Sequence, residues 1–310
     1  MINKTNTFPP YLKEEDQVRL VSPAGSISPE LIDGAEKLLS SWGYKVIRGE
    51  HVGGEYGRYS GTPKERLSDL QQALDDQNCS AIFCTRGGYG AVHLIDKISF
   101  DGFRSHPKWL VGYSDITMLH ERLQMEGYAS IHGGMAKLLT EEISKENPDV
   151  VEPASMLHDI ICGKLPDYTI KSHDLNRIGD AGGCLSGGNL SILYSLRGTK
   201  YDFIPDGSIL FIEDIGEKPY VVDRMMHNFK LGGIFERISG MIVGQFSEYE
   251  EDPLMRMTVY EIIADVVSEY TFPVCFDFPV GHVTRNLPLV SGADVEMHVN
   301  VEGAKILYIK

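Results

Sequence analysis

Three positions carry the residue types that a serine hydrolase needs, and the first of them is Ser114. It follows the apolar run Trp109-Leu110-Val111-Gly112-Tyr113, and a helical pattern begins directly after it. A serine on a tight turn between a strand and a helix exposes its hydroxyl at the end of the sheet, and the backbone N–H groups that follow face a developing oxyanion. The segment departs from G-x-S-x-G because Ile116 stands at the place of the second glycine. Ser114 is therefore a candidate nucleophile, with the N-cap of the following helix as its alternative role.

The other two positions lie in the second half of the chain. Glu213 ends the apolar run Ile209-Leu210-Phe211-Ile212, and His282 lies in a stretch rich in glycine and proline. A serine hydroxyl needs a neutral imidazole to take its proton, and that imidazole needs a carboxylate to orient it. Glu213 and Asp214 could instead hold a metal ion together with His282, but no H-E-x-x-H or paired-histidine spacing accompanies them.

A glycine turn, Arg86-Gly87-Gly88-Tyr89-Gly90, follows another apolar run. Glycines at the carboxyl end of a parallel strand let backbone N–H groups approach a ligand closely. Arg86 offers a bidentate clamp for a carboxylate, or it is simply a solvated arginine beside a strand-to-helix turn. The spacing is not the G-x-G-x-x-G of a dinucleotide site.

Short β-branched runs and amphipathic stretches alternate through the first half of the chain, which predicts a parallel sheet flanked by helices. The expected strands span residues 18–22, 45–48, 81–85 and 109–113. The expected helices span about 29–42, 64–74 and 116–124. In such a sheet Ser114 and the glycine turn each follow a strand at the same edge.

The second half has a different pattern, which predicts a mixed α+β lobe. A strand is expected over residues 208–212, a helix over about 219–229, and a hairpin over 294–300 and 305–309. Residues 139–177 show weak periodicity and three prolines. We therefore expect an N-terminal lobe over 1–145, a linker over 146–176 and a C-terminal lobe over 177–310.

Charge and cysteine usage exclude several classes of protein. Lysine and arginine number 29 against 44 acidic residues, so the net charge of −15 disfavours nucleic acid and anionic lipid as partners. The five cysteines are an odd number with no C-x-x-C pair, which favours a reducing compartment. The first residues lack the apolar segment of a signal peptide, so a cytoplasmic protein is expected.

Several motifs in a fixed order resemble the LD-carboxypeptidase family of serine peptidases, which includes murein tetrapeptide carboxypeptidases and microcin C immunity hydrolases. The motifs are Val21-Ser22-Pro23-Ala24-Gly25, Arg86-Gly87-Gly88-Tyr89-Gly90, Gly112-Tyr113-Ser114-Asp115, His132-Gly133-Gly134-Met135, Gly187-Gly188-Asn189-Leu190, Glu213-Asp214-Ile215-Gly216-Glu217-Lys218-Pro219-Tyr220, Asp223-Arg224-Met225 and Gly281-His282.

The resemblance implies a role for individual residues. Ser114 matches the family nucleophile, His282 the base and Glu213 the carboxylate that orients the base. The oxyanion hole would use the backbone N–H groups of Asp115 and Gly88, with Gly87 as the alternative. Arg86 is our own candidate for binding a substrate carboxylate.

The resemblance also implies a flavodoxin-like N-terminal lobe, a mixed α+β C-terminal lobe and a homodimer that uses no metal or organic cofactor. The expected activity is that of a serine carboxypeptidase, which hydrolyses an L,D-peptide bond and releases terminal D-alanine from murein tetrapeptides in cell-wall recycling. One alternative is a microcin C-type immunity hydrolase that cleaves a peptidyl or aminoacyl nucleotide amide. Another, from a different class, is a catalytically inactive muropeptide-binding protein.

Overall fold

The structure, a computed structural model, describes residues 6–142 and 147–309. These residues form two compact units, each with its own sheet. The N-terminal unit comprises residues 6–165 and 284–290, and the C-terminal unit comprises 166–283 and 291–309. The expected boundary between residues 145 and 146 lies outside the described residues. The expected linker contains a helix, α6 (Pro148–Ile161), and a strand, β6 (Tyr168–Lys171).

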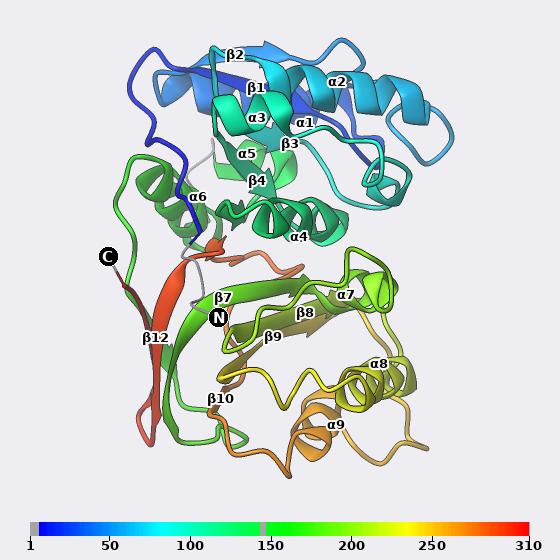
Figure 1. Cartoon of the computed structure of the whole chain (residues 1–310), viewed down its shortest axis with the longest axis vertical. Coiled ribbons are helices and arrows are strands. Elements are labelled where there is room, and N and C mark those ends of the chain that lie inside the picture. Colours follow the sequence, from blue (N-terminus) through cyan, green and yellow to red (C-terminus); the bar gives the residue numbers. More distant parts are fainter. Residues whose placement is uncertain (1–5, 143–146, 310) are drawn as a thin grey trace. The chain divides into compact units, whose positions relative to one another are not determined.

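The N-terminal unit is built on a six-stranded sheet with the order β11-β5-β4-β3-β1-β2 (Figure 1). Its strands are β1 (Gln17–Val21), β2 (Lys45–Arg48), β3 (Cys79–Cys84), β4 (Trp109–Gly112), β5 (Ser130–His132) and β11 (Leu289–Ser291). The pairs β2-β1, β1-β3, β3-β4 and β4-β5 are all parallel. The order 2-1-3-4-5 is that of flavodoxin-like folds, so the fold class expected for this half is confirmed.

Helices α1 (Pro29–Ser41), α2 (Pro63–Asp75) and α4 (Thr117–Met125) connect strands of this sheet, as the alternating pattern predicted. A short helix that was not predicted, α3 (Asp101–Ser105), lies between β3 and β4, and α5 (Ala136–Glu142) and α6 follow β5. The start of α2 is fixed by a capping box, in which the Thr62 side chain accepts from the Glu65 N–H while the Glu65 carboxylate accepts from the Thr62 N–H. Leu70, Ala73 and Leu74 form its buried face.

A buried lysine closes the other end of α2. Lys108 immediately precedes β4 and is fully buried. Its ammonium donates to the carbonyls of Ala73, Leu74 and Asp76 at 3.2, 2.9 and 2.5 Å. The last carbonyls of a helix have no partner within it, so a cation at this position satisfies them and opposes the negative end of the helix dipole. Lys108 therefore anchors α2 at the amino end of β4.

The C-terminal unit has a seven-stranded mixed sheet with the order β10-β9-β8-β7-β12-β13-β6, as expected for a mixed lobe. The further strands are β7 (Gly179–Asn189), β8 (Ile209–Ile215), β9 (Gly240–Ser247), β10 (Val274–Cys275), β12 (Asp294–Asn300) and β13 (Gly303–Tyr308). The first half of β7 pairs antiparallel with β12, and its second half pairs parallel with β8. This long strand therefore joins the terminal hairpin to the parallel part of the sheet (Figure 1).

Three helices belong to the C-terminal unit: α7 (Leu190–Leu196), α8 (Pro219–Leu231) and α9 (Val259–Val266). One apolar cluster joins their buried faces to β8 and β9, and includes Met225, Met226 and Phe229 of α8. Helix α9 begins at a second capping box, formed by Thr258 and Glu261. Across the described ranges, we find no helix with the length and apolar character that a membrane span requires.

Two glycines of β7 should differ in how much an alanine substitution lowers the stability of the fold. Gly187 has φ 140°, and a Cβ added there would lie 1.9 Å from the Phe211 carbonyl oxygen of the paired strand β8. We expect Gly187→Ala to lower the free energy of unfolding by about 3 kcal/mol or more, because both the backbone angle and the strand pairing must change. Urea unfolding followed by circular dichroism would measure the loss.

The matched control is Gly182→Ala in the same strand. A Cβ at Gly182 would meet its nearest neighbour, the Val295 carbonyl oxygen, at an ordinary 3.8 Å. Its unfolding midpoint should stay close to that of the unmodified protein. Equal midpoints for the two alanine variants would contradict this account of β7.

Candidate active site

Ser114 lies at a tight turn between β4 and α4. Tyr113 is extended, with φ −152° and ψ −174°, and Ser114 has φ 65°. A non-glycine residue in this left-handed region is strained, as it is in the nucleophile turns of α/β hydrolases. The N-cap of α4 is Ile116, which makes no side-chain capping bond. The alternative role of Ser114 as the N-cap of this helix is therefore not what the structure shows.

The glycine turn after β3 packs directly against this serine. A Cβ added at Gly87 would lie 2.7 Å from Ser114 Cβ, 3.0 Å from Ser114 Oγ and 3.1 Å from the Asp115 backbone nitrogen. Any side chain larger than hydrogen would collide with the serine. Gly88, the next residue, has φ 92° and so adopts a conformation that favours glycine. Gly87 thus lies beside the hydroxyl and the first N–H that follows it, whereas the nearest neighbours of Gly88 are Gly25 and Arg86.

The Arg86 side chain is exposed and is held by the backbone of a neighbouring loop. Its Nη1 donates to the Ser26 carbonyl at 2.5 Å. The loop and the turn are joined again by a backbone bond, in which the Gly25 N–H donates to the Gly87 carbonyl at 2.8 Å. Arg86 therefore has one donor group engaged by the loop after β1, and its role toward a substrate carboxylate stays a prediction.

Asp115 carries a buried carboxylate next to the candidate nucleophile. Its Oδ2 accepts a hydrogen bond from the Ala91 N–H at 2.8 Å. Burial raises the pKa of Asp115 to about 6, although backbone hydrogen bonds from Ala91 and Gly90 and the positive charge of Arg66 act in the opposite direction. The Asp115 side chain therefore binds the turn at Gly90 and Ala91.

Glu213 and His282 are brought together in the C-terminal unit. The Glu213 carboxylate, at the end of β8, is fully buried, and its Oε2 lies 2.8 Å from His282 Nδ1. The imidazole is 14% exposed. Burial alone would lower the pKa of His282, but the hydrogen bond and charge of Glu213, with smaller contributions from Asp214 and Glu248, raise it above 6.5. This is the geometry of a base whose orientation is set by a carboxylate.

The backbone on both sides of His282 is closely fitted to this pair. Gly281 has φ 131°, and a Cβ there would lie 3.0 Å from Glu213 Oε2 and 2.9 Å from the Gln245 carbonyl oxygen. The Ser247 hydroxyl donates to the His282 carbonyl at 3.0 Å. Glycine before the histidine is therefore required for the carboxylate to approach the ring.

Asp214 acts as a structural neighbour of Glu213. Its Oδ1 accepts from Asn189 Nδ2 at 3.0 Å and from the Ile215 N–H at 2.8 Å, while its Oδ2 accepts from the Ser191 N–H and hydroxyl at 2.8 and 2.5 Å. Burial raises the pKa of Asp214. With its oxygens engaged in this way, Asp214 ties the end of β8 to the end of β7 and the start of α7.

The alternative in which Glu213, Asp214 and His282 bind a metal ion is not supported by the part of the chain that the structure describes. No group of three or more histidine, cysteine, aspartate or glutamate side chains is placed there to hold a metal ion.

The site residues predicted from the sequence fall into two sets. Ser114, Asp115, Gly87, Gly88 and Arg86 belong to the N-terminal unit, and Glu213 and His282 belong to the C-terminal unit.

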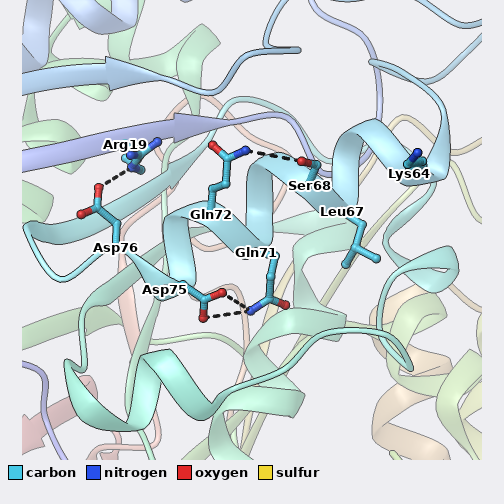
Figure 2. Close-up of a pocket in the computed structure, with 8 residues that line it drawn as sticks. All are labelled: Arg19, Lys64, Leu67, Ser68, Gln71, Gln72, Asp75 and Asp76. Carbon is cyan, nitrogen blue, oxygen red and sulfur yellow. Dashed lines mark hydrogen bonds and ion pairs between the residues drawn. The ribbon is translucent and has the colours of Figure 1, made fainter.

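A surface hollow of about 670 Å³ in the N-terminal unit contains none of these residues (Figure 2). Its lining is Arg19, Lys64, Leu67, Ser68, Gln71, Gln72, Asp75 and Asp76. Figure 2 shows that the polar groups largely pair with one another, as in the 2.8 Å ion pair of Arg19 with Asp76 and the hydrogen bonds of Gln71 with Asp75. The hollow beside α2 therefore offers no additional candidate for chemistry.

One buried charged residue beside the glycine turn was not singled out from the sequence. Arg66 lies on α2 with only 1% of its surface exposed, and its Nη1 donates to the Gly90 carbonyl. A signal was available, because Arg66 precedes the buried Leu70 by four residues and Ala73 by seven. A charged residue on the apolar stripe of a helix needs buried partners.

Comparison with known proteins agrees with this fold. Residues 18–133 match the LD-carboxypeptidase N-terminal domain, and residues 182–297 match the LD-carboxypeptidase C-terminal domain. The chain is 32% identical over 307 residues to a Bacillus subtilis protein named "Probable murein peptide carboxypeptidase", covering 97% of this chain and 94% of the relative. It is 27% identical over 280 residues to the murein tetrapeptide carboxypeptidase of Pseudomonas aeruginosa, covering 88% of this chain and 90% of that one.

Solved structures share the same architecture. The muramoyltetrapeptide carboxypeptidase of Oxalobacter formigenes superposes with a TM-score of 0.84 at 23% identity, covering 95% of this chain and 99% of that one. The microcin C7 self-immunity protein MccF superposes with a TM-score of 0.85 at 20% identity, covering 98% and 99%. At these identities the likeness shows the fold.

The fold and the matched domains define a two-lobed α/β hydrolase of the carboxypeptidase type. The chain belongs to the LD-carboxypeptidase family, as its sequence motifs implied.

The Glu213 and His282 pair predicts a measurable change in titration. We expect Glu213→Gln to lower the pKa of His282, because a neutral amide cannot stabilise the imidazolium while the penalty of burial remains. NMR titration of the His282 ring protons would measure the shift. Glu248→Gln is the control, since Glu248 is the smallest of the contributors and should leave the pKa almost unchanged. An unaltered His282 titration in Glu213→Gln would contradict the assigned pairing.

Proposed function

We propose that this protein is a serine LD-carboxypeptidase that removes the terminal D-alanine from murein tetrapeptides, a reaction of cell-wall recycling. In this proposal Ser114 is the nucleophile, His282 the base and Glu213 the residue that orients the base. The observation that carries it is the 2.8 Å hydrogen bond between Glu213 and His282 in a chain of this family. The names of the Bacillus and Pseudomonas relatives support the choice of substrate.

The proposed mechanism follows from the hydrogen-bonding pattern of the imidazole. With Nδ1 engaged by Glu213, Nε2 is the nitrogen that takes the Ser114 hydroxyl proton. The serine oxygen forms a bond to the carbonyl carbon of the peptide, and the carbonyl π electrons move onto its oxygen. When the tetrahedral intermediate collapses, the C–N bond breaks and His282 gives its proton to the departing amine of D-alanine. Water, deprotonated by His282, then attacks the carbonyl carbon of the acyl-enzyme ester. The C–O bond to Ser114 breaks, and His282 returns the proton to the serine oxygen.

The negative charge on the carbonyl oxygen needs hydrogen-bond donors that are already in place. We propose that the Asp115 N–H and an N–H of the Gly87-Gly88 pair supply them. The position of Gly87 supports this choice of turn, since a Cβ added there would lie 3.0 Å from Ser114 Oγ and 3.1 Å from the Asp115 nitrogen. A single donor of this kind contributes roughly 3 to 4 kcal/mol to transition-state stabilisation.

Replacement of the nucleophile tests the proposal directly. We expect Ser114→Ala to reduce kcat for release of D-alanine by on the order of 10⁶, because no hydroxyl remains to form the acyl-enzyme. Release is measured with a tetrapeptide that ends in D-alanine. Ser105→Ala, at the exposed end of α3, is the control and should retain activity. Near-normal cleavage by Ser114→Ala would overturn the nucleophile assignment.

Detection of the acyl-enzyme separates catalysis from simple binding. Mass spectrometry of the unmodified protein after brief mixing with the tetrapeptide should show the added acyl group on Ser114. Tight binding without turnover or adduct would instead favour the inactive muropeptide-binding alternative.

A second substrate class is considered because solved MccF structures contain aminoacyl sulfamoyl nucleosides. MccF in complex with aspartyl sulfamoyl adenosine superposes with a TM-score of 0.85 at 20% identity. We expect this protein to release D-alanine from the tetrapeptide and to leave aspartyl sulfamoyl adenosine intact, since its more similar relatives carry murein peptidase names. Offering both compounds at equal concentration and following products by chromatography would decide between them. Cleavage of the nucleoside alone would remove the murein assignment.

A further inference from the structure

Arg66 makes an unusual set of contacts for a residue within a helix. Its Nε donates to the Gly61 carbonyl at 3.0 Å, and its Nη1 donates to the carbonyls of Pro23 and Gly90 at 2.6 and 2.8 Å. The guanidinium also lies over the Tyr59 ring, 5.1 Å from its centroid. A buried cation without acceptors would be costly, and here backbone carbonyls from three separate segments accept its hydrogen bonds.

Asp115 reaches the same turn from the opposite direction. The Gly90 carbonyl that accepts from Arg66 and the Ala91 N–H that donates to Asp115 belong to one peptide group. That peptide group is therefore held at its oxygen by a cation and at its nitrogen by a carboxylate. Both side chains are almost completely buried, with 1% of Arg66 and 0% of Asp115 exposed.

Only glycine at position 90 leaves room for Arg66 to approach this peptide group. Gly90 has φ 139°, and a Cβ there would lie 2.7 Å from Arg66 Nη1 and 3.1 Å from Tyr59 Cδ1. Three residues earlier, the same turn brings Gly87 against Ser114. The position of the turn beside the serine thus depends on where the Gly90–Ala91 peptide group is held.

We propose that the side chains of Arg66 and Asp115 are positioning residues that clamp the Gly90–Ala91 peptide group and thereby hold the Gly87-Gly88 donors in register with Ser114. This inference rests on the proposed function, because it concerns the stabilisation of the oxyanion. Neither side chain touches the reacting atoms. Asp115 then has two separate roles, with its N–H serving the oxyanion and its carboxylate serving the turn.

Displacement of oxyanion donors slows the chemical step more than it weakens substrate binding. The test therefore compares the change in kcat with the change in KM. We expect Asp115→Ala and Arg66→Lys each to lower kcat by about 10²-fold with little change in KM, since a small misplacement of catalytic groups has an effect of that order. A lysine carries its donors on a single nitrogen, so it cannot reproduce the hydrogen bonds that Arg66 makes from two nitrogens, Nε and Nη1. Asp115→Asn should recover about tenfold in kcat over Asp115→Ala, because its amide oxygen can still accept from the Ala91 N–H.

Lys108→Met is the matched control for loss of a buried cation. Lys108 also donates to three backbone carbonyls in this unit, but it does so at the amino end of β4, whereas Ser114 follows the carboxyl end. This variant should unfold at a lower temperature and keep its kcat while folded. Circular dichroism and thermal unfolding establish that each variant is folded at the assay temperature. If Arg66→Lys does not fold, the comparison of kcat between Asp115→Ala and Asp115→Asn alone tests the clamp.

The outcomes separate this inference from the proposed function. Values of kcat within about twofold of the unmodified protein for Asp115→Ala, or equal values for Asp115→Ala and Asp115→Asn, would overturn the clamp and leave the nucleophile in place. An equally large loss of kcat in Lys108→Met would reduce Arg66 to a purely structural role. Retained activity in Ser114→Ala would remove the proposed function itself.

Discussion

The hydrogen bond between Glu213 and His282 sets the chemistry that the C-terminal unit can perform. A fully buried carboxylate 2.8 Å from the ring raises the pKa of His282 above 6.5 against the effect of burial. The stabilisation that the charged pair gives to the fold is complete below pH 6.5 and is lost as pH rises through the raised pKa. In the proposed mechanism His282 must be neutral to act as a base, so activity would rise over the same pH range in which this contribution to stability declines.

In the N-terminal unit, the constraint is the backbone conformation of Ser114 and its packing against Gly87. Ser114 occupies the left-handed region with φ 65°, and Gly87 packs against it so closely that no side chain fits between them. Such strain persists only when the surroundings hold it. The buried side chains of Arg66 and Asp115 provide contacts of that kind around the neighbouring turn.

Much of this arrangement could be predicted from the sequence, because periodicity and turn residues act locally. The strands that precede Ser114 and the glycine turn, and the helices at 29–41 and 63–75, appear within a few residues of their expected places. The family motifs pointed to Glu213 and His282, whose pairing the structure shows. The place of Arg66 on the apolar stripe of α2 could have been read from the sequence, but its contacts could not, because it donates to backbone carbonyls from separate segments and carbonyls leave no signature in sequence. The glycine-rich strand β7 was missed as a strand because glycine has low β-propensity.

The path of the chain between the two units has a consequence for how the protein is made. The chain leaves the N-terminal unit after Leu165 and returns to it only for residues 284–290, directly after His282 has been reached. Strand β11, which those residues begin, occupies the edge of the sheet beside β5. During translation β5 therefore remains an open edge, able to pair with other chains, until most of the C-terminal unit has emerged from the ribosome. Nascent chains stalled before residue 284 should be the ones that most need chaperones.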